Sequence, residues 1–502
     1  MTLIADGPTA TQLTTTDPRD GSAIATYPVA GPADVDRAVA AAAVVAPWWR
    51  DRGFDGRLKV LQAWKAEIAA NARDLADVIS RETGKTPDDA LLEVVLTLTH
   101  LDWASKNARK VLRRRKVAAG LANYNQSASV GYEPFGVVGV IGPWNYPFYT
   151  PMGSIGYALS AGNAVVFKPS ELTPATAKWI EEAWNRVAPD RPVLQVVVGD
   201  GATGEALASS AVDKVAFTGS PGTARKVMAA AARNLTPIVV EAGGKDAMIV
   251  TRQADLDAAV GFAVFGGMGN AGQTCAGVER VYVEAPVYDA FMEKLVASAA
   301  RLKPGPEASA SYGPMTLARQ SEVISSQIAG ALERGATAVL GGADSVKDGY
   351  VGPVILTGVP DDCAVVQRET FGPVLVVDRV ADVDEAVAKA NASEYGLSAS
   401  VFTKDHAAGL EIAERLRCGA VSIDSVLGFG GIPGLPFGGR GESGFGRIHG
   451  ADGLREFSVA KSIAVQKSKA FIDLLTMDRS EKDMHLAERM LHMLHAKGGA
   501  KR

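Results

Sequence analysis

Short β-branched runs alternate with helix-length segments from Val130 onward, and this order constrains the fold more than any other feature of the sequence. The run AVVFKPSE, for example, precedes the helical pattern TPATAKWIEEAWNRV, which precedes the run VLQVVVGDG. Neighbouring parallel strands need a long crossover connection, so this order predicts parallel sheets with helices on both faces. A second series begins with DAMIV and ends with AVSID. We therefore predict an α/β protein with two lobes that meet near Glu241, preceded by an Ala-rich helical region from about Ala33 to Leu112.

The composition excludes several classes of protein. With 502 residues, 47% of them hydrophobic, the chain can bury more than one core. The 52 basic and 56 acidic residues give a net charge of -4 and are interspersed, which argues against a nucleic-acid or membrane partner. Three cysteines without a Cys-x-x-Cys pair indicate neither a disulfide framework nor a zinc site. Because the N-terminus lacks a signal-peptide pattern and no apolar run could span a bilayer, we expect a cytoplasmic protein without a bound metal.

Three glycine-containing segments resemble phosphate-binding loops. RETGKT has the Gly-Lys-Thr of a Walker loop, but Ile79 stands where the first glycine is needed, and the segment continues a helical pattern. GDGATG, which begins at Gly199, matches the dinucleotide fingerprint after a strand. In FTGSPGTARKV a strand is expected to end at Phe217 and a helix to begin near Ser220, so that free backbone N–H groups would face a phosphate. Only one of the last two segments can hold a single pyrophosphate, and spacing alone does not decide between them.

Cys275 is the candidate nucleophile. It lies in the small, polar, glycine-rich stretch GNAGQTCAG and not on an apolar face, where a structural cysteine is normally buried. A reactive cysteine needs a group that favours its thiolate or accepts its proton, and Glu241 in VVEAGGKDA supplies a carboxylate, whereas the histidines are scattered. Asn145, between Pro143 and Pro147, supplies an amide donor suited to an oxyanion hole. Each residue alone has a structural explanation, as a buried thiol, a surface glutamate or a turn asparagine, but the three together favour a site.

Seven motifs follow one another in the order GPWNYP, FKPSE, FTGS, EAGGK, GNAGQTC, ETFGPV and PFGGRGESGFGR. In order and approximate spacing they resemble the NAD(P)-dependent aldehyde dehydrogenase superfamily, from about Asp17 to Val465. The resemblance implies oxidation of an aldehyde to a carboxylic acid with NAD as hydride acceptor. Cys275 matches the nucleophile, which forms a thiohemiacetal and then a thioester. Asn145 and the Cys275 backbone N–H match the oxyanion-binding donors, and Glu241 matches the base that activates water for hydrolysis.

The resemblance also implies a nicotinamide cofactor site. It selects FTGSPG as the pyrophosphate segment and makes GDGATG a chance match. Glu171 would place a carboxylate at the adenosine ribose hydroxyls, so a 2′-phosphate would be repelled and NAD would be preferred to NADP. The residues that match cofactor contacts are Trp144, Lys168, Glu171, Gly219, Ser220, Glu369 and Phe371.

By resemblance, the fold combines a Rossmann-like cofactor domain, a second α/β catalytic domain and a small β-hairpin oligomerisation element. We expect the NAD-binding domain in residues 1–123 and 137–240 and the catalytic domain in 241–440. The oligomerisation element is expected in 124–136 and 455–467, with its hairpin pairing with the later strand. Such hairpins join subunits into dimers or dimers of dimers, so a homodimer or homotetramer is expected.

The C-terminal tail, 468–502, lies outside the resemblance. Met484, Ala487, Leu491 and Leu494 recur at helical spacing with charges between them, which predicts an amphipathic helix. Its basic end could favour anionic lipid, but docking on the same or a neighbouring subunit is the preferred interpretation.

The substrate and two rival functions are the open points. Phe148, Tyr149, Leu427 and Phe429 in the expected mouth loops indicate an apolar aliphatic or aromatic aldehyde. One rival is a CoA-acylating aldehyde dehydrogenase, for which the base Glu241 would be unnecessary, and the other is a non-catalytic binding or structural relative, which would not need the cysteine and the base. The chain departs from the usual family pattern at Ala242, at Asp246 with Ala247, and at Gly441, which bears on substrate and packing more than on reaction type.

Overall fold

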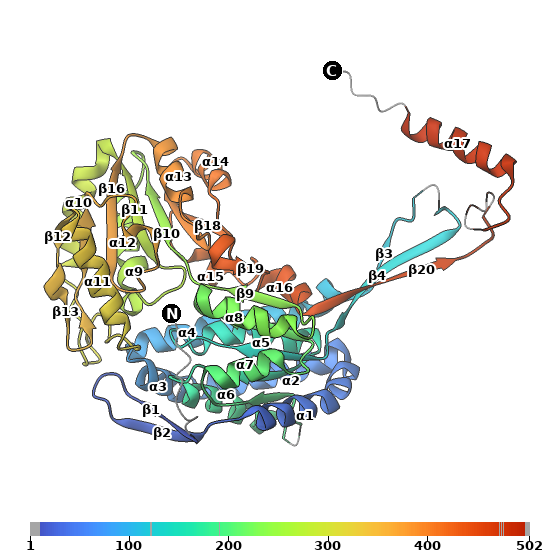
Figure 1. The fold of residues 1–502 in the computed structure, drawn as a ribbon, viewed down its shortest axis with the longest axis horizontal. Coiled ribbons are helices and arrows are strands. Elements are labelled where there is room, and N and C mark those ends of the chain that lie inside the picture. Colours follow the sequence, from blue (N-terminus) through green and yellow to red (C-terminus); the bar gives the residue numbers. More distant parts are fainter. Residues whose placement is uncertain are drawn as a thin grey trace. The chain divides into compact units, whose positions relative to one another are not determined.

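The computed structural model describes residues 11–120, 123–189, 191–470, 472, 474 and 476–496 (Figure 1). In this part the chain forms two compact units. The larger comprises residues up to Val111 together with Pro134–Ser458, and the smaller comprises Leu112–Glu133 together with the chain from Val459 onward. All the predicted catalytic and cofactor-binding residues therefore belong to the larger unit.

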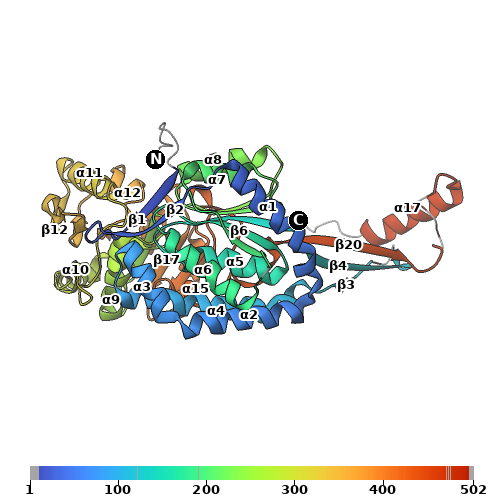
Figure 2. The same ribbon diagram turned by 90° about the horizontal axis from the view of Figure 1, so that it is seen from below.

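A six-stranded sheet forms the centre of one half of the larger unit. Its strand order is β19-β9-β8-β5-β6-β7, and all neighbours are parallel except β19, which runs antiparallel to β9. The β-branched strands VVGVI and AVVFK are buried along their whole length, as expected of a parallel sheet covered on both faces. Figure 2 shows α5 and α6 on one side of β6, and α7 and α8 on the other. The bounds are β5 Val137–Ile141, β6 Ala164–Lys168, β7 Leu194–Val196, β8 Lys214–Thr218, β9 Ile238–Glu241, β19 Gly444–Phe445, α5 Tyr149–Ala161, α6 Pro174–Val187, α7 Gly201–Ser209 and α8 Pro221–Ala232.

Four helices precede this sheet, where the Ala-rich helical region was predicted. Trp49 of the first helix and Trp64 of the second both make edge-to-face contacts with Trp184 of α6, with ring centroids 5.7 and 5.1 Å apart. These buried indoles attach the helical layer to the sheet because aromatic side chains bury a large apolar area in such pairs. The bounds are β1 Gln12–Thr16, β2 Ala23–Pro28, α1 Pro32–Asp51, α2 Gly53–Ala70, α3 Ala72–Thr83 and α4 Pro87–Leu112.

A seven-stranded sheet forms the centre of the other half of the larger unit. Its order is β12-β15-β16-β11-β10-β17-β18, and only β12 runs antiparallel to its neighbour. The strands are β10 Asp246–Val250, β11 Val278–Glu284, β12 Thr337–Leu340, β15 Val354–Thr357, β16 Val374–Val380, β17 Ser398–Phe402 and β18 Ala420–Ile423. The helices are α9 Leu256–Met268, α10 Ala285–Ala299, α11 Gln320–Glu333, α12 Ala364–Gln367, α13 Val383–Asn391, α14 His406–Arg415, α15 Gly428–Gly431 and α16 Gly450–Glu456, and a short hairpin is formed by β13 Val346–Lys347 and β14 Tyr350–Val351.

Alternate residues of the central strand β10 enter two different cores. Met248 packs into the core that includes Phe291 of α10, whereas Ile249 packs into the core that includes Val387 of α13 and Ile412 of α14. Side chains of a strand alternate between the two faces of a sheet, so the run DAMIV must be apolar throughout to serve both. This sheet is therefore covered by helices on both faces, which confirms the predicted α/β class.

The chain passes from one sheet to the other through the segment EAGGK. The last residue of β9 is Glu241 and the first residue of β10 is Asp246, so the two sheets meet within four residues of connecting chain. The connection includes Gly243 with φ of 74°, a left-handed conformation that glycine adopts without steric cost. The predicted base therefore lies at the carboxyl end of one sheet, where the other sheet begins.

The smaller unit contains a three-stranded sheet with the order β20-β4-β3. The long strands β4, Gln126–Pro134, and β20, Ser458–Gln466, lie side by side as the sequence predicts. The third strand, β3, Arg115–Val117, pairs antiparallel with β4 and comes from the basic stretch before it, which the sequence analysis placed in the cofactor domain. The role of this sheet in oligomerisation stays a prediction.

The tail forms the amphipathic helix α17, Glu481–His495. Ser480 caps it by accepting a hydrogen bond from the Asp483 backbone N–H, in a capping box that starts a helix without help from tertiary packing. No residue of α17 is buried in the described chain, and Met484 and Leu491 are half exposed or more. The helix therefore presents an apolar face within the smaller unit.

Removal of residues 469–502 is expected to change the oligomer size or to lower Tm by on the order of 2 °C or more, because docking of α17 on protein would bury its apolar face. Size-exclusion chromatography with light scattering and a thermal melt would measure both. Unchanged size and Tm together with lost binding to anionic liposomes would contradict docking on protein and support a lipid-binding helix.

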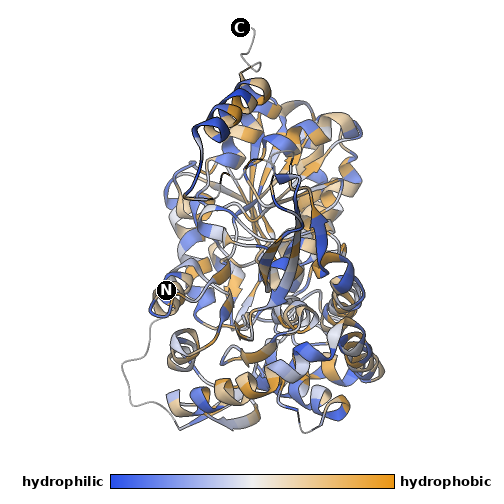
Figure 3. Ribbon diagram, turned by 90° about the vertical axis from the view of Figure 1, so that its right-hand side faces the viewer, coloured by the Kyte–Doolittle hydropathy of each residue, from blue (hydrophilic) through white to orange (hydrophobic). Residues whose placement is uncertain are grey.

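The distribution of hydropathy follows these layers. In Figure 3 the strands in the interior are mostly orange, whereas the surrounding helices, α17 among them, carry both colours. Among the described residues, no helix has the length and apolar character needed to cross a membrane.

Candidate active site

A strained turn leads into the candidate nucleophile. After α9, residues Asn270, Ala271 and Gly272 adopt φ of 52°, 55° and 71° in succession. Non-glycine residues adopt this left-handed region at a cost, and such strain concentrates at functional sites. A Cβ atom at Gly272 would lie 2.2 Å from the Gly372 carbonyl, so the turn is pressed against the loop that carries ETFGP. The turn therefore fixes the position of the backbone that leads to Cys275.

Glu241 and Cys275 lie next to each other and influence each other's ionisation. Burial raises the pKa of the Cys275 thiol well above its ordinary value, and the negative charge of Glu241 raises it further. Burial likewise raises the pKa of Glu241, which is 6% exposed. The hydrogen bond from the Cys275 thiol opposes the rise in the Glu241 pKa, so the carboxylate lies where it can accept the proton of the thiol.

The two oxygens of Glu241 have different environments. Oε2 accepts a hydrogen bond from the Thr218 hydroxyl at 3.4 Å, at the end of the neighbouring strand β8. Oε1 is buried and has no hydrogen-bond partner among the described residues. A buried carboxylate oxygen without a partner is costly, and a water molecule would satisfy it. Glu241 therefore has one oxygen free to accept a hydrogen bond from a water.

Asn145 is attached directly to the nucleophile loop. Its Nδ2 atom donates a hydrogen bond to the Gln273 carbonyl at 2.9 Å, two residues before Cys275. Nδ2 carries two hydrogens, so the second N–H can serve a substrate oxygen. Tyr146, the next residue, shares a hydrogen bond of 3.0 Å between its hydroxyl and that of Thr274. The structure thus brings the predicted oxyanion donor beside the predicted nucleophile.

Gln273 is a functional residue that the sequence analysis did not single out. Its backbone N–H and its Nε2 both donate to the Asn270 carbonyl, at 3.1 and 3.0 Å, and close the strained turn. Its own carbonyl accepts from Asn145. The only available signal was its position inside the motif GNAGQTC.

The helix α8 offers the better site for a pyrophosphate. Its N-terminus is capped by the neutral hydroxyl of Ser220, which accepts from the Thr223 N–H at 3.3 Å. The competing helix α7 is capped by the carboxylate of Asp200, which accepts from the Ala202 N–H at 2.9 Å and would repel a phosphate. At Gly219 a Cβ atom would lie 2.7 Å from the Phe217 ring, so the backbone there has no room for a side chain. These residues fit a dinucleotide at α8.

Lys168 and Glu171 lie at the end of β6 and face each other. The Lys168 ammonium is buried, and burial lowers its pKa, while the nearby Glu171 charge opposes that shift. Lys168 Nζ lies 3.6 Å from Glu171 Oε2, and the Glu171 side chain is 43% exposed. A buried cation beside a partly exposed carboxylate fits the hydroxyl groups of a ribose, which need both donors and acceptors.

Trp144, Glu369 and Phe371 are brought together on the other side of the site. The rings of Trp144 and Phe371 meet edge to face with centroids 5.4 Å apart. Glu369 accepts a hydrogen bond from the Gly244 N–H at 3.0 Å, in the segment that joins the two sheets. Burial, with the nearby charge of Glu279 as the second cause, raises the pKa of Glu369 to about 8. These groups could flank a nicotinamide and its ribose.

A buried ion pair that the sequence analysis missed holds this loop. Glu279 accepts from the backbone N–H groups of Thr370 and Phe371, each at 2.9 Å, and pairs with the ammonium of Lys245. Phe371 itself has φ of 53°. The charge pair therefore helps to keep the ETFGP loop in a strained conformation, which a hydrophobic pair could not do by hydrogen bonding.

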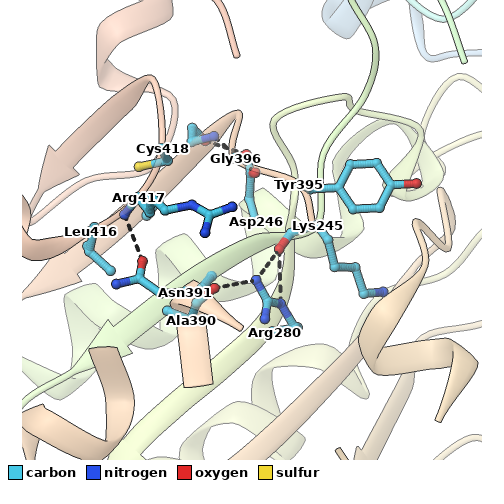
Figure 4. A pocket seen from close by; sticks show the side chains of 13 residues that line it. Lys245, Asp246, Arg280, Ala390, Asn391, Tyr395, Gly396, Leu416, Arg417 and Cys418 are labelled. Atoms are coloured by element: carbon cyan, nitrogen blue, oxygen red, sulfur yellow. Dashed lines mark hydrogen bonds between the residues drawn. The ribbon is translucent and has the colours of Figure 1, made fainter. Parts of the chain in front are cut away.

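A small pocket near β10 does not belong to the reaction centre (Figure 4). Its polar groups are already satisfied: Arg280 donates to the Lys245 carbonyl at 2.6 Å, and Asp246 accepts from the N–H and hydroxyl of Ser398. Asp246, one of the departures from the family pattern, is thus a packing residue of this pocket. The lining comprises Lys245, Asp246, Ala247, Arg280, Ala390, Asn391, Tyr395, Gly396, Ser398, Ala399, Leu416, Arg417 and Cys418.

Two histidines pack beside the loops that were predicted to form the substrate mouth. Tyr149 donates from its hydroxyl to the Gly430 carbonyl at 2.9 Å, and His100 donates to the same carbonyl at 2.7 Å. The His100 ring contacts that of His449 with centroids 3.8 Å apart and an interplanar angle of 36°. Phe148, by contrast, is fully buried. Histidines that are 349 positions apart could not be paired from the sequence, and both rings are buried beneath the expected mouth loops.

Comparison with known proteins agrees with the geometry. A sequence model of the aldehyde dehydrogenase family matches residues 5–463. A 4,4'-diapolycopene aldehyde oxidase of Methylomonas sp is 37% identical over 462 residues, which are 91% of this chain and 87% of that protein. The structure of PnpE in complex with nicotinamide adenine dinucleotide is 33% identical, with a TM-score of 0.86, and the match covers 93% of this chain and 96% of that one. An NADP-dependent glyceraldehyde-3-phosphate dehydrogenase from Bacillus halodurans C-125, complexed with NADP, is 29% identical with a TM-score of 0.85 and covers 91% and 96%. The chain belongs to the aldehyde dehydrogenase family.

Proposed function

We propose that this aldehyde dehydrogenase oxidises an aldehyde to a carboxylic acid through a thioester on Cys275, with NAD as the preferred acceptor. The observation that carries the proposal is that the Glu241 carboxylate lies beside the Cys275 thiol, while the Asn145 amide is hydrogen-bonded to the same loop two residues before Cys275. Nucleophile, base and oxyanion donor are the three groups that acyl chemistry at an aldehyde carbon requires.

The first half-reaction forms the thioester. Glu241 takes the proton of the thiol, and the Cys275 sulfur bonds to the aldehyde carbon. The Asn145 side-chain amide and the Cys275 N–H hold the negative oxygen of the thiohemiacetal. A nicotinamide held by Trp144, Glu369 and Phe371 would supply the hydride acceptor, and loss of hydride from the carbon would leave an acyl group on the Cys275 sulfur.

The second half-reaction releases the acid. After the thiol proton has passed from Glu241 to solvent, Glu241 deprotonates a water that is hydrogen-bonded to its otherwise unpartnered Oε1, and this second proton goes to the departing Cys275 sulfur. Addition of the oxygen to the thioester carbon and cleavage of the carbon–sulfur bond return the cysteine and give the carboxylic acid. Aldehyde, water and the oxidised nicotinamide are thereby converted to acid, the reduced nicotinamide and a proton.

Two alternatives are less well supported. A CoA-acylating enzyme would pass the acyl group to a thiol and would not need a base with an open oxygen, which Glu241 provides. A non-catalytic relative would have no need for Cys275, Glu241 and Asn145 in one buried cluster. Formation of NADH from a panel of aldehydes, with and without CoA, separates the three functions, because only the proposed one gives free acid without CoA.

The substrate is proposed at the level of its class. The family relatives named above act on chemically different aldehydes, so the family does not fix it. Phe429 and Phe437 stack with centroids 5.3 Å apart in the mouth region, which favours an apolar aliphatic or aromatic aldehyde. A panel ranked by kcat/KM is the direct measurement, and a clear preference for charged aldehydes would contradict this class.

NAD is expected to exceed NADP in kcat/KM by about tenfold, because the Glu171 carboxylate and a 2′-phosphate would repel each other at close range. The nearby Lys168 ammonium limits the ratio, since it could pair with the phosphate. Glu171→Ser is expected to bring the two efficiencies close to each other, whereas Glu182→Ser, an exposed glutamate on α6, should leave the ratio unchanged. Equal or better efficiency of the wild type with NADP would contradict the preference.

A further inference from the structure

The RETGKT segment does not fit the pattern of a phosphate-binding loop. Instead it contacts the loop that carries Asn145. Its turn follows α3 at Gly84, which has φ of 78° and where a Cβ atom would lie 2.9 Å from both Pro18 and Pro314. On the other side, a Cβ atom at Gly313 would lie 1.8 Å from the Gly84 carbonyl oxygen. The backbone at this turn is therefore fixed by close packing on both sides, and Lys85 extends from a rigid position.

Lys85 bonds to the backbone of the oxyanion donor. Its side chain is fully buried, and Nζ donates to the Asn145 carbonyl at 2.8 Å and to Glu93 Oε2 at 2.8 Å. Nζ also lies 4.1 Å from the centre of the Tyr146 ring, where the π face favours a cation. The same carbonyl also accepts from Asn270 Nδ2 at 3.2 Å, so the shorter, charged bond from Lys85 and the amide bond from Asn270 together orient the peptide from which the Asn145 side chain starts.

Glu93 holds the other end of the same loop. Its Oε1 accepts from the backbone N–H groups of Phe148 and Tyr149, each at 2.8 Å, at the start of α5. The first N–H groups of a helix have no partner within the helix, and a carboxylate is well suited to bind them. The pair therefore holds the segment from Asn145 to Tyr149 at both ends with charged hydrogen bonds.

The hydrogen bonds form a closed circuit with the nucleophile loop. Lys85 donates to Asn145, and Asn145 donates to the Gln273 carbonyl at 2.9 Å. Gln273 Oε1 accepts from the Thr316 N–H at 2.9 Å, and the Thr316 hydroxyl donates to the Thr83 carbonyl at 2.6 Å, two residues before Lys85. A displacement of Lys85 would therefore act first on Asn145, whereas the loop that leads to Cys275 is also held by the bonds of Gln273 to the Asn270 carbonyl.

We propose that Lys85 and Glu93 are positioning residues that set the Asn145 amide for oxyanion binding; this inference rests on the proposed function. A buried charged pair is a poor way to gain stability, since well-packed apolar residues of similar volume often serve as well. What an apolar pair cannot supply is a charged donor to the Asn145 carbonyl, which Asn270 alone would hold only through a neutral amide, and an acceptor for two backbone N–H groups. The placement of an oxyanion donor within a fraction of an ångström has a large effect on rate, which gives such a pair a function.

The test is a double-mutant cycle on the full-length protein, with aldehyde and NAD. Lys85→Met is expected to lower kcat by on the order of 100-fold while KM changes by less than about threefold. In an Asn145→Ala background, Lys85→Met should change kcat by less than about twofold, because the group through which it acts is already gone. The rate of Cys275 alkylation by iodoacetamide should stay within about threefold of wild type, as expected if the nucleophile loop is intact.

Lys214→Met is the matched control, because Lys214 is also a buried lysine paired with a glutamate, Glu456, but lies outside the site. It should lower Tm and leave kcat within about twofold of wild type. If Lys85→Met does not fold, Glu93→Gln carries the same test, with an expected loss in kcat of about tenfold that disappears in the Asn145→Ala background.

The inference is overturned if Lys85→Met keeps the wild-type kcat. It is also overturned if Lys85→Met lowers kcat by the same factor in the wild-type and in the Asn145→Ala background. Failure of the proposed function would look different, since the wild-type protein itself would then form no acid and no NADH from any aldehyde.

Discussion

Cys275→Ala is expected to lower kcat for aldehyde oxidation by on the order of 10⁴-fold or more, because no other group in the cluster can form the carbon–sulfur bond. The measurement is steady-state NADH formation with the best aldehyde of the panel. The variant should still fold, since Cys275 is only half-buried and its neighbours are held by Asn145 and Gln273.

Cys418→Ala is the control for this experiment. Cys418 is also half-buried, but its thiol bonds only to the Ala420 carbonyl in the second sheet. Its removal should leave kcat within about twofold of wild type. More than about 1% of wild-type activity in Cys275→Ala would contradict the role assigned to this cysteine.

Asn145→Ala is expected to lower kcat by about 10²- to 10³-fold, the range found when one oxyanion donor is removed. KM should change less, because the amide acts on charge that develops after binding. Kinetics at saturating cofactor would show the split. A rise in KM with unchanged kcat would instead assign Asn145 to ground-state substrate binding.

The layered fold could be predicted because buried parallel strands appear in a sequence as short, continuous apolar runs. The strands AVVFK and DAMIV are mostly apolar and fully buried, and both were predicted as strands. The short strand Arg115–Val117 was not predicted as a strand. RKV is exposed along its whole length, and it is a strand only because it pairs with β4. Its β conformation comes from a tertiary contact and not from its own pattern.

The candidate site was predictable as a set of residues but not as a set of contacts. Cys275, Glu241 and Asn145 stand out because their residue types are unusual in their surroundings. Lys85, in contrast, lies 60 positions from the carbonyl that it binds, and nothing local distinguishes it from a lysine on a solvated helix end. A buried charge is recognised by its partners, and the partners depend on the fold.

The backbone strain of the turn before Cys275 could not be predicted from the sequence either. Ala271 has φ of 55°, although alanine avoids this region and favours helices. The segment GNAGQ contains two glycines that indicate a turn, but the strained residues include Asn270 and Ala271 between them. The surrounding hydrogen bonds of Gln273 impose that conformation.

The hydrolysis of the thioester is expected to depend on pH through Glu241. The group acts as a base only when deprotonated, and burial raises its pKa above the ordinary value of 4.5. The deacylation rate should therefore fall as pH is lowered through this raised pKa and should reach its plateau above it. A single-turnover pH profile would measure this dependence, and Glu241→Gln should abolish the titration.

The central claim is that Cys275 carries the acyl group and Glu241 releases it. The most direct test mixes Glu241→Gln protein with aldehyde and NAD and measures the intact mass of the protein with the NADH formed. One equivalent of NADH per active site and a mass increase equal to the acyl group, lost in Cys275→Ala, is the expected result. An unmodified Glu241→Gln protein that forms no NADH, or one that turns over at the wild-type rate, would contradict it.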